Sequence, residues 1–340
     1  MKSGENLKIV IAGASGFVGR NIAEFLIEKG FEVYPVLRRR TLEKTGEVLK
    51  IYEEKRSRPL IIESFSRERL REEFRRIKPD ILINAIGLLK GSERELYEAH
   101  VGVVEEILGS LELPRGEEVL YIHISSTGAS DMRLGKPVRE EEEHCSHIDS
   151  LRTYYEKSKC LGEIRVREIC GEKGFKYVIL RPSIIIGEYN THREWINILR
   201  LSRIGIELDI GTRINILDVK DLAGIVLLLI ERRDLANDFY HIASPKDIRI
   251  SDISRVALRI IGRRGFLRIG MRSLRIASSI ARPFLGDIDR RFLEVLLTGD
   301  ARISSEKFIG KTGYRFRDPM ESLERFFTWL KKAMDSLDSH

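Results

Sequence analysis

The chain has 340 residues, of which 42% are hydrophobic, so it is not a disordered polypeptide and has room for one large domain or two modest ones. The formal net charge of +7 favours anionic partners such as nucleotides, phosphorylated substrates, nucleic acids or membrane surfaces. No apolar run approaches the ~20 residues of a membrane-spanning helix, and we expect a soluble, cytoplasmic protein without a signal peptide. Cys145, Cys160 and Cys170 are odd in number and widely spaced, which resembles neither a disulfide framework nor a zinc site.

Short β-branched runs alternate with helical patterns through the first half of the chain. The patterns predict strands at 7–12, 31–37, 60–62, 81–84, 119–124 and 177–180, and helices at 18–29, 66–77, 94–111 and 151–170. This alternation predicts an α/β fold with a doubly wound parallel sheet. Apolar runs such as KIVIA and DILINA suit strands that are buried on both faces.

The alternation weakens after residue 186, and the pattern becomes mainly helical. We expect a nucleotide-binding domain at 1–186, to which 212–245 returns. A smaller, mainly helical C-terminal substrate domain is expected at 187–211 and 246–333, followed by a tail at 334–340.

A glycine-rich turn, Gly13-Ala14-Ser15-Gly16-Phe17-Val18-Gly19, stands between the first predicted strand and the first predicted helix. Such a turn lets the backbone approach a pyrophosphate, and the helix N-terminus offers free N–H groups and a positive dipole end. The spacing is G-x-x-G-x-x-G rather than the G-x-G-x-x-G of many dehydrogenases. We therefore predict nucleotide binding, with an ordinary tight turn as the alternative.

The second predicted strand ends in Leu37-Arg38-Arg39-Arg40, where many dinucleotide-binding proteins carry an acidic residue for the ribose diol. A carboxylate repels a 2′-phosphate, whereas arginine binds one. This segment favours NADP as the cofactor, with NAD as the alternative. A solvated basic loop would explain the same residues.

Further motifs follow in chain order, and together they resemble the extended short-chain dehydrogenase/reductase family. They are Asn84-Ala85-Ile86-Gly87, His123-Ile124-Ser125-Ser126, Tyr155-x-x-x-Lys159, Arg181-Pro182-Ser183, Leu217–Asp221 and Gly310–Arg317. The resemblance implies a Rossmann-type fold, a homodimer and an NAD(P)-dependent oxidoreductase or epimerase. Such an enzyme acts by hydride transfer on a secondary alcohol or ketone, here of a small-molecule substrate such as a nucleotide sugar or a bulky hydrophobic alcohol.

Tyr155 and Lys159 are spaced to share one face of a helix. A lysine ammonium beside a phenol lowers the pKa of the phenol, which would make Tyr155 a general acid and base near neutral pH. The resemblance implies that Lys159 also binds the nicotinamide ribose and that Ser126 holds the substrate oxygen. Ser125 and Thr127 are the alternatives to Ser126.

The glycine turn, the arginines and the resemblance together predict a set of cofactor-binding residues. The set is Gly13, Ser15, Gly16, Phe17, Val18, Gly19, Arg38, Arg39, Glu63, Asn84, Ala85, Gly87, Lys159, Pro182 and Ser183.

Three positions depart from the family pattern. Glu63 stands where the family has an aspartate near the adenine, and the aromatic-glycine pair after the active serine is absent. His100 stands where the family has an asparagine that bends its helix, and it either makes a similar bond or is a half-buried helix residue. These departures keep open a second function, a nucleotide-binding scaffold or accessory subunit without turnover.

Two other segments carry reactive or charged side chains. Glu140–Glu143 and His144-Cys145-x-His147 offer metal ligands that lie too close together to surround one ion, so we expect no metal. The stretch 263–282 places arginines at helical spacing without an acidic residue, which predicts a basic amphipathic helix. It would contact a membrane surface, bind a nucleotide diphosphate or pack on its own domain. No aromatic-basic platform indicates a nucleic-acid partner.

Overall fold

The computed structural model describes residues 7–43, 47–55, 57–112, 118–130, 137–140, 144–281, 297 and 300–338. The chain divides into two compact units. The first unit comprises Met1–Ser130, Glu141–Pro182 and Leu222–Tyr240, and the second comprises Asp131–Glu140, Ser183–Asp221 and His241–His340. Segments 131–140, 183–186, 212–221 and 241–245, which the sequence pattern assigned to the first domain, lie in the second unit. The short strands of 183–186 and 212–221 pair with each other.

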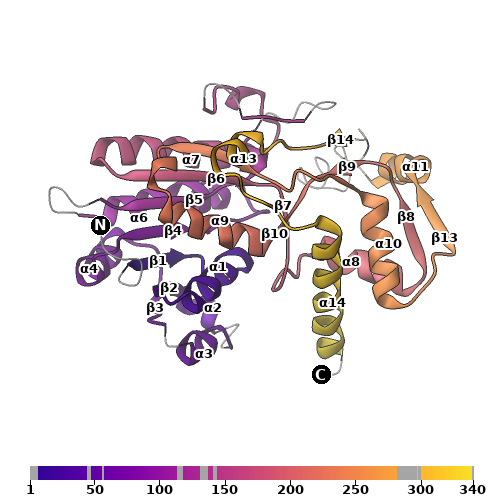
Figure 1. The fold of residues 1–340 in the computed structure, drawn as a ribbon, viewed down its shortest axis with the longest axis horizontal. Helices are drawn as coiled ribbons and strands as arrows, with labels where there is room; N and C mark the ends of the chain where they lie inside the picture. Colours follow the sequence, from indigo (N-terminus) through magenta and orange to yellow (C-terminus); the bar gives the residue numbers. More distant parts are fainter. Residues whose placement is uncertain are drawn as a thin grey trace. The chain divides into compact units, whose positions relative to one another are not determined.

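The first unit is built on a seven-stranded sheet in the order β11-β6-β5-β4-β1-β2-β3 (Figure 1). Neighbours from β3 to β6 run parallel, so the carboxyl ends of these strands lie along one edge, where doubly wound sheets bind their ligands. The strands are β1 (Lys8–Ala12), β2 (Glu32–Arg38), β3 (Leu60–Ile62), β4 (Ile81–Asn84), β5 (Leu120–Ile124), β6 (Lys176–Pro182) and β11 (Asp238–Ile242). The expected Rossmann-type parallel sheet is confirmed.

Helices cover this sheet. The largest core cluster joins Val10, Leu82 and Tyr121 of the strands to apolar side chains of α4, α6 and α7. The helices are α1 (Phe17–Glu28), α2 (Arg39–Leu42), α3 (Glu47–Glu54), α4 (Arg67–Ile77), α5 (Glu93–Tyr97), α6 (Val103–Ser110), α7 (Tyr154–Lys173) and α9 (Val219–Glu231), with short turns at Thr127–Ala129, Ile148–Ser150 and Arg233–Leu235.

The predicted helix at 94–111 contains a π-helical turn, η2 (Glu98–Gly102), between α5 and α6. Gly162 of α7 packs against this turn, because a Cβ at Gly162 would lie 2.3 Å from the carbonyl oxygen of His100. π-Turns inside helices often mark functional sites. Here the turn brings His100 into the interior, where it is 1% exposed.

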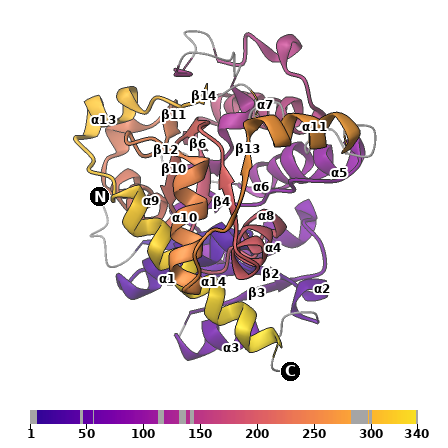
Figure 2. The same ribbon diagram turned by 90° about the vertical axis from the view of Figure 1, so that its right-hand side faces the viewer.

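The second unit combines helices with small sheets around the buried rings of Trp195, Phe326 and Phe327. Helices α10 and α14 lie side by side (Figures 1 and 2). The helices are α8 (Arg193–Arg203), α10 (Ile250–Ile261), α11 (Met271–Ala281), α13 (Glu306–Thr312) and α14 (Pro319–Asp338). The strands are β7 (Ile184–Ile186), β8 (Ile206–Asp209), β9 (Arg213–Ile214), β10 (Ile216–Asp218), β12 (Ile248–Arg249), β13 (Leu267–Gly270) and β14 (Asp300–Ala301).

The prediction of one continuous basic helix over 263–282 is wrong. Gly262 ends α10 in a left-handed conformation, residues 263–266 have no regular structure, and β13 pairs with β8 before α11 begins at Met271. Arg282 lies outside the described residues. Within the described part of the chain, no helix has the length and apolar character needed to cross a membrane.

Candidate active site

The glycine turn between β1 and α1 is closed in by the backbone that follows β4. Gly13 has φ 84°, and a Cβ there would lie 2.8 Å from the carbonyl carbon of Ala85. A Cβ at Gly19 would lie 2.3 Å from the carbonyl oxygen of Gly13. Neither position tolerates a side chain, because the turn packs directly against the backbone of Ala85 and against itself.

The N-terminus of α1 carries the remaining residues of the predicted turn. Gly16 caps the helix without a side-chain hydrogen bond, and its own amide donates to Gly13 O at 3.0 Å. The amides of Phe17 and Val18 begin the helix, and Ser15 precedes it with a half-buried side chain. A helix start with free N–H groups suits a pyrophosphate. The residues present therefore fit a bound dinucleotide.

Two buried tyrosines, which no sequence motif predicts, hold the backbone of the glycine turn and the segment after β4 in place. Tyr52 of α3 donates to the carbonyl oxygen of Ala14 at 2.7 Å. The amide nitrogen of Asn84 donates to Tyr121 Oη at 2.9 Å, and its amide oxygen accepts from the backbone of Ile86 at 3.0 Å. Both tyrosines lie far along the chain from the turn, and no local motif marks them.

The arginines at the end of β2 differ in their contacts. Arg39 pairs with Glu63, and both side chains remain well exposed, at 60% and 74%. Glu63, which we expect near the adenine of the cofactor, forms this ion pair in the free protein. The side chain of Arg38 is exposed and forms no hydrogen bond or ion pair within the described residues. Its guanidinium is therefore available to a phosphate.

Helix α7 begins immediately before the predicted catalytic pair. Thr153 caps it by accepting from the amide of Glu156, whose carboxylate accepts from the Thr153 amide in return. Tyr155 and Lys159 stand one turn apart on this helix. The side chains of Tyr155 and Ser126 both lie against Gly128, because a Cβ at Gly128 would be 3.1 Å from Tyr155 Cε1 and 3.3 Å from Ser126 Oγ. The structure thus brings the three predicted catalytic residues together within the first unit.

The alternatives to Ser126 are engaged elsewhere or buried. Ser125 donates to Glu163 Oε1, and Thr127 is 8% exposed. Ser126 is half-buried and accepts from the amide of Gly128 at 3.0 Å. Among the three hydroxyls, Ser126 is the one that meets Tyr155.

Lys159 is 4% exposed, and its ammonium group makes no hydrogen bond within the described residues. Its Nζ lies 3.4 Å from the position that a Cβ at Gly87 would take, so Gly87 leaves space for the ammonium. Burial lowers the pKa of Lys159 to about 8, although the Glu163 carboxylate acts in the opposite direction. Its donors are therefore available to a bound ribose.

The pKa of Tyr155 is raised, and burial is the main cause. The contact with the Ser126 side chain acts to lower the pKa, and the neighbouring Glu156 charge acts to raise it. The expectation of a lowered Tyr155 pKa is therefore wrong for the free protein. The lysine is itself desolvated beside Gly87, and burial dominates the tyrosine.

His100 links the π-turn to this site. Its Nε2 accepts from the amide of Leu88 at 3.2 Å, which leaves a proton on Nδ1, 2.8 Å from Ser158 Oγ. Its ring meets the ring of Tyr155 edge-on at 5.5 Å. Burial, helped by the charge of Lys159, lowers the pKa of His100 to about 2. His100 is thus a fully buried, neutral residue rather than a half-buried one, and it packs against Tyr155.

A buried network lies next to the candidate site. Arg181, at 0% exposure, donates through Nη2 to Glu163 Oε2 at 2.7 Å and through Nη1 to Ser130 Oγ at 3.0 Å. Glu163 also accepts from Ser125 and meets His144 Nε2 at 2.7 Å. Burial alone would raise the pKa of Glu163, but the charge of Arg181 and the hydrogen bonds hold it well below its usual range.

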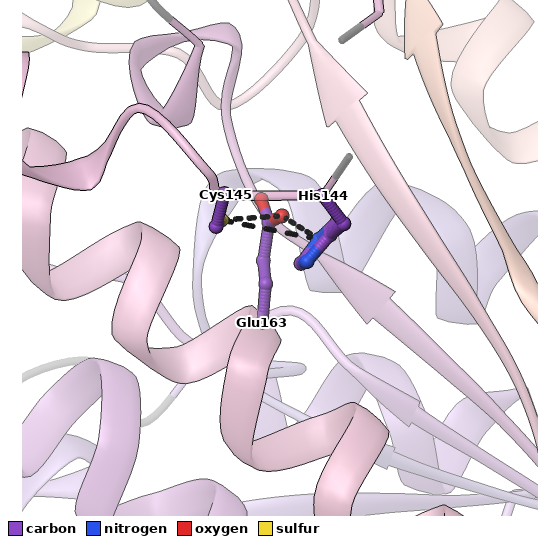
Figure 3. Close-up of side chains that lie close together, drawn as sticks. All are labelled: His144, Cys145 and Glu163. Atoms are coloured by element: carbon purple, nitrogen blue, oxygen red, sulfur yellow. Dashed lines mark hydrogen bonds and ion pairs between the residues drawn. The ribbon is translucent and has the colours of Figure 1, made fainter. Parts of the chain in front are cut away.

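The side chains of His144, Cys145 and Glu163 point toward one another (Figure 3), with ligand atoms within 4.8 Å. Each of these groups has a partner, because Glu163 pairs with Arg181 and Cys145 forms a disulfide with Cys160. The expectation of no disulfide is therefore wrong. The segment before α7 turns back on the helix, which brings the two Cα atoms to 6.0 Å despite 15 residues of separation. Residues 141–143 lie outside the described part.

The last motifs meet in the second unit. Arg317 donates its amide to Asp221 Oδ2 at 3.0 Å, and Tyr314 Oη lies 3.2 Å from Asp221 Oδ1. These contacts join the segments 217–221 and 310–317. Pro182 ends β6, and the amide of Ser183 donates to Ile242 O at 2.9 Å. Ser183 Oγ is buried and lacks a hydrogen-bond partner among the described residues.

Comparisons with known proteins agree with this geometry. The model of the NAD dependent epimerase/dehydratase family matches residues 9–243. A Synechocystis sp. protein named "Putative dihydroflavonol 4-reductase" is 25% identical over 225 residues, which cover 65% of this chain and 62% of that protein. The chain thus spans less than two thirds of that relative.

Solved structures resemble the chain over almost its whole length. The UDP-glucose 4-epimerase of Thermotoga maritima has a TM-score of 0.72 at 17% identity, covering 96% of this chain and 100% of that one. The dTDP-glucose 4,6-dehydratase of Bacillus anthracis, in complex with NAD, has a TM-score of 0.72 at 13% identity, with 97% and 98% covered. At these identities the likeness concerns the fold.

Proposed function

Because the chain belongs to the NAD-dependent epimerase/dehydratase family, we propose that it is an NADP-dependent oxidoreductase that interconverts a secondary alcohol and a ketone. The observation that carries the proposal is that Ser126 and Tyr155 lie together against Gly128, on the helix that also carries the buried Lys159. When bound, the nicotinamide supplies or accepts the hydride. Side chains of this protein position the substrate and transfer the proton.

Tyr155 is the proton donor and acceptor in the proposal. In the direction of ketone reduction, the Tyr155 hydroxyl gives its proton to the substrate oxygen while the carbonyl carbon receives hydride. Ser126 holds the same oxygen through its hydroxyl. Burial raises the Tyr155 pKa in the free protein, so the phenol carries its proton there.

Lys159 has two roles in the proposal. Its ammonium binds the nicotinamide ribose, next to the backbone opening left by Gly87. Its positive charge also stabilises the phenolate that Tyr155 becomes after proton transfer. Binding of nucleotide and substrate beside Lys159 would remove water from it and so strengthen this interaction.

Arg38 supports the choice of NADP over NAD. It ends β2, is exposed, and has no partner within the described residues, whereas Arg39 is paired with Glu63. A free guanidinium binds a 2′-phosphate with two parallel hydrogen bonds. A cofactor that exchanges with solvent suits a reductase better than an epimerase, which keeps its NAD through the cycle. NAD remains the alternative.

The substrate class that we propose is a bulky hydrophobic ketone or alcohol, with a nucleotide sugar as the second choice. The name of the Synechocystis relative, a dihydroflavonol reductase, supports the first. The likeness of fold to the Thermotoga maritima epimerase supports the second. A cytoplasmic homodimer is the form in which we propose that the enzyme works.

The test is NADPH oxidation with a panel of hydrophobic ketones, comparing the wild type with Tyr155→Phe. Loss of the acid should lower kcat by about 10²–10⁴ while the Kd for NADPH stays within a few-fold. Tyr154→Phe, at the neighbouring half-buried tyrosine, is the matched control and should keep its activity. Equal activity of the Tyr155→Phe variant and the wild type would overturn the assignment.

A second function, a nucleotide-binding scaffold without turnover, is favoured by the absence of the aromatic-glycine pair after Ser126 and by His100 at the family's asparagine position. A scaffold would bind NADPH but reduce no ketone and oxidise no alcohol in the panel. The wild type alone separates the two functions, because only the enzyme consumes NADPH in step with ketone.

A further inference from the structure

The second unit exposes large apolar side chains that its core does not use. Phe266 is 80% exposed, Ile276 66%, Ile204 59% and Leu267 51%. The other large apolar side chains that face solvent in the described part, such as Leu89 and Tyr97 at 39%, are less exposed. A group of such side chains on a folded protein marks an interaction surface.

Three of these side chains are held together by the backbone. Ile204 and Gly205 lead from α8 into β8, and β13 pairs in parallel with β8, with Leu267 opposite Ile206. The amides of Phe266 and Leu267 both donate to the carbonyl oxygen of Gly205, at 3.0 and 3.3 Å. The ring of Phe266 lies over Gly205, where a Cβ would be 2.2 Å from a ring carbon. The exposed position of Phe266 is thus built into the fold.

The stretch that carries Phe266 and Leu267 has only positive ionisable side chains, whereas the paired strand β8 carries Glu207 and Asp209. From residue 253 to residue 286 the sequence holds eight arginines and no aspartate, glutamate or lysine. The side chains of Arg263, Arg264 and Arg272 are exposed and form no hydrogen bond or ion pair within the described residues. Arg268 is 67% exposed and meets Glu207 at 3.3 Å. We call Ile204, Arg263, Arg264, Phe266, Leu267 and Arg272 the basic apolar patch.

We propose that the basic apolar patch binds the surface of an anionic lipid bilayer. Phe266 and Leu267 enter the boundary between headgroups and acyl chains, and the arginines contact lipid phosphates. Arginine suits this role because it binds phosphate with paired hydrogen bonds while its aliphatic stem covers apolar surface. The proposal is independent of the hydride chemistry.

Two other partners, a second copy of this chain and a nucleic acid, fit the patch less well. A two-fold dimer would place this patch against itself and so bring unpaired arginines against arginines. A nucleic acid would use the arginines but leave Ile204 and Leu267 without a partner, because single strands stack on aromatic rings and Phe266 is the one ring of the patch. An anionic bilayer satisfies both the charged and the apolar side chains.

The experiment is flotation of the full chain with vesicles. We expect binding to phosphatidylcholine vesicles that contain phosphatidylglycerol, no binding to phosphatidylcholine alone, and weaker binding as salt rises. The double variant Phe266→Ser/Leu267→Ser should bind at least about tenfold more weakly. The same loss is expected for Arg263→Ala/Arg264→Ala.

Matched controls separate the patch from the general charge of the protein. Ile61→Ser removes an apolar side chain that is 36% exposed in the first unit, and Arg69→Ala/Arg75→Ala removes two exposed arginines of α4. Both controls should bind vesicles like the wild type, and unchanged melting temperatures should show that every variant is folded.

Three results would overturn the proposal. One is the absence of binding to the anionic vesicles. Another is an equal loss in patch and control variants, which would mean adhesion by net charge alone. The third is binding of single-stranded DNA that competes with the vesicles and depends equally on Phe266, which would assign the patch to nucleic acid.

Discussion

Glu163 on α7 and Arg181 at the end of β6 form an ion pair in which neither side chain is exposed, with Arg181 Nη2 2.7 Å from Glu163 Oε2. Through Ser125 and Ser130 the pair holds both ends of the segment that carries Ser126. The same helix carries Tyr155 and Lys159. The ion pair therefore fixes the position of the candidate serine relative to the tyrosine.

Replacing Glu163 by glutamine should leave the Arg181 guanidinium buried without a counter-charge. We expect the free energy of unfolding to fall by about 3–5 kcal/mol. Chemical denaturation measures it, and Glu168→Gln, at an exposed position of the same helix, is the control. A Glu163→Gln variant as stable as Glu168→Gln would contradict the role given to the pair.

Replacing Arg38 by serine should weaken the binding of NADPH and leave that of NADH nearly unchanged. A charge-assisted contact to the 2′-phosphate predicts a loss of about 1.5–3 kcal/mol, or roughly tenfold to a hundredfold in Kd. Fluorescence titration with both nucleotides measures the ratio. Arg40→Ser, in the same run of exposed arginines, should change neither affinity. A loss of equal size for NADPH and NADH would show that Arg38 does not contact the 2′-phosphate.

The pKa of Lys159 predicts how stability depends on pH without nucleotide. Burial lowers this pKa from 10.5 to about 8, so between these values the unfolded chain holds the proton and the folded chain has released it. Lys159 should therefore contribute a rise in the free energy of unfolding across this window, of about 3 kcal/mol. Lys159→Met should remove this contribution from the pH profile, whereas Lys157→Met should retain it. An equal pH dependence in the wild type and in Lys159→Met would rule out this explanation.

The number of free thiols in solution tests the disulfide between Cys145 and Cys160. Thiol titration of the unreduced, denatured chain should find one free thiol, that of Cys170, and should find three after reduction. Closing this loop should stabilise the chain by about 3 kcal/mol, so reductant should lower the Tm of the wild type. Cys145→Ala should melt at the same temperature with and without reductant. Three free thiols before reduction would exclude the bond.

Much of the first unit could be predicted because its signals are local. Buried parallel strands and the glycine turn are short patterns, and Tyr155 and Lys159 need only helical spacing to come together. Contacts between residues far apart in the sequence leave no such local pattern. Gly162 shows no sign in the sequence that it meets the His100 carbonyl, and Glu163 is separated from Arg181 by 18 residues. Such contacts depend on which helix packs on which strand.

Two errors have physical causes of the same kind. The arginine spacing over 263–282 is helical, but pairing of β13 with β8 overrides local propensity. The Tyr155 pKa was argued from its neighbour alone, whereas burial is the larger effect in the folded chain. Both effects come from tertiary structure, which the one-dimensional pattern does not contain.

The measurement that tests the central claim most directly is a thermal-shift titration with NADPH, NADH and their oxidised forms, on protein shown to be free of retained nucleotide. A ligand that binds only the folded state stabilises it by RT ln(1 + [L]/Kd), so at equal concentration the tighter ligand raises the Tm more. We expect the largest rise with NADPH or NADP⁺ and a smaller rise with the NAD forms. No rise with any of the four would contradict a nucleotide site at the glycine turn, and with it the proposed oxidoreductase.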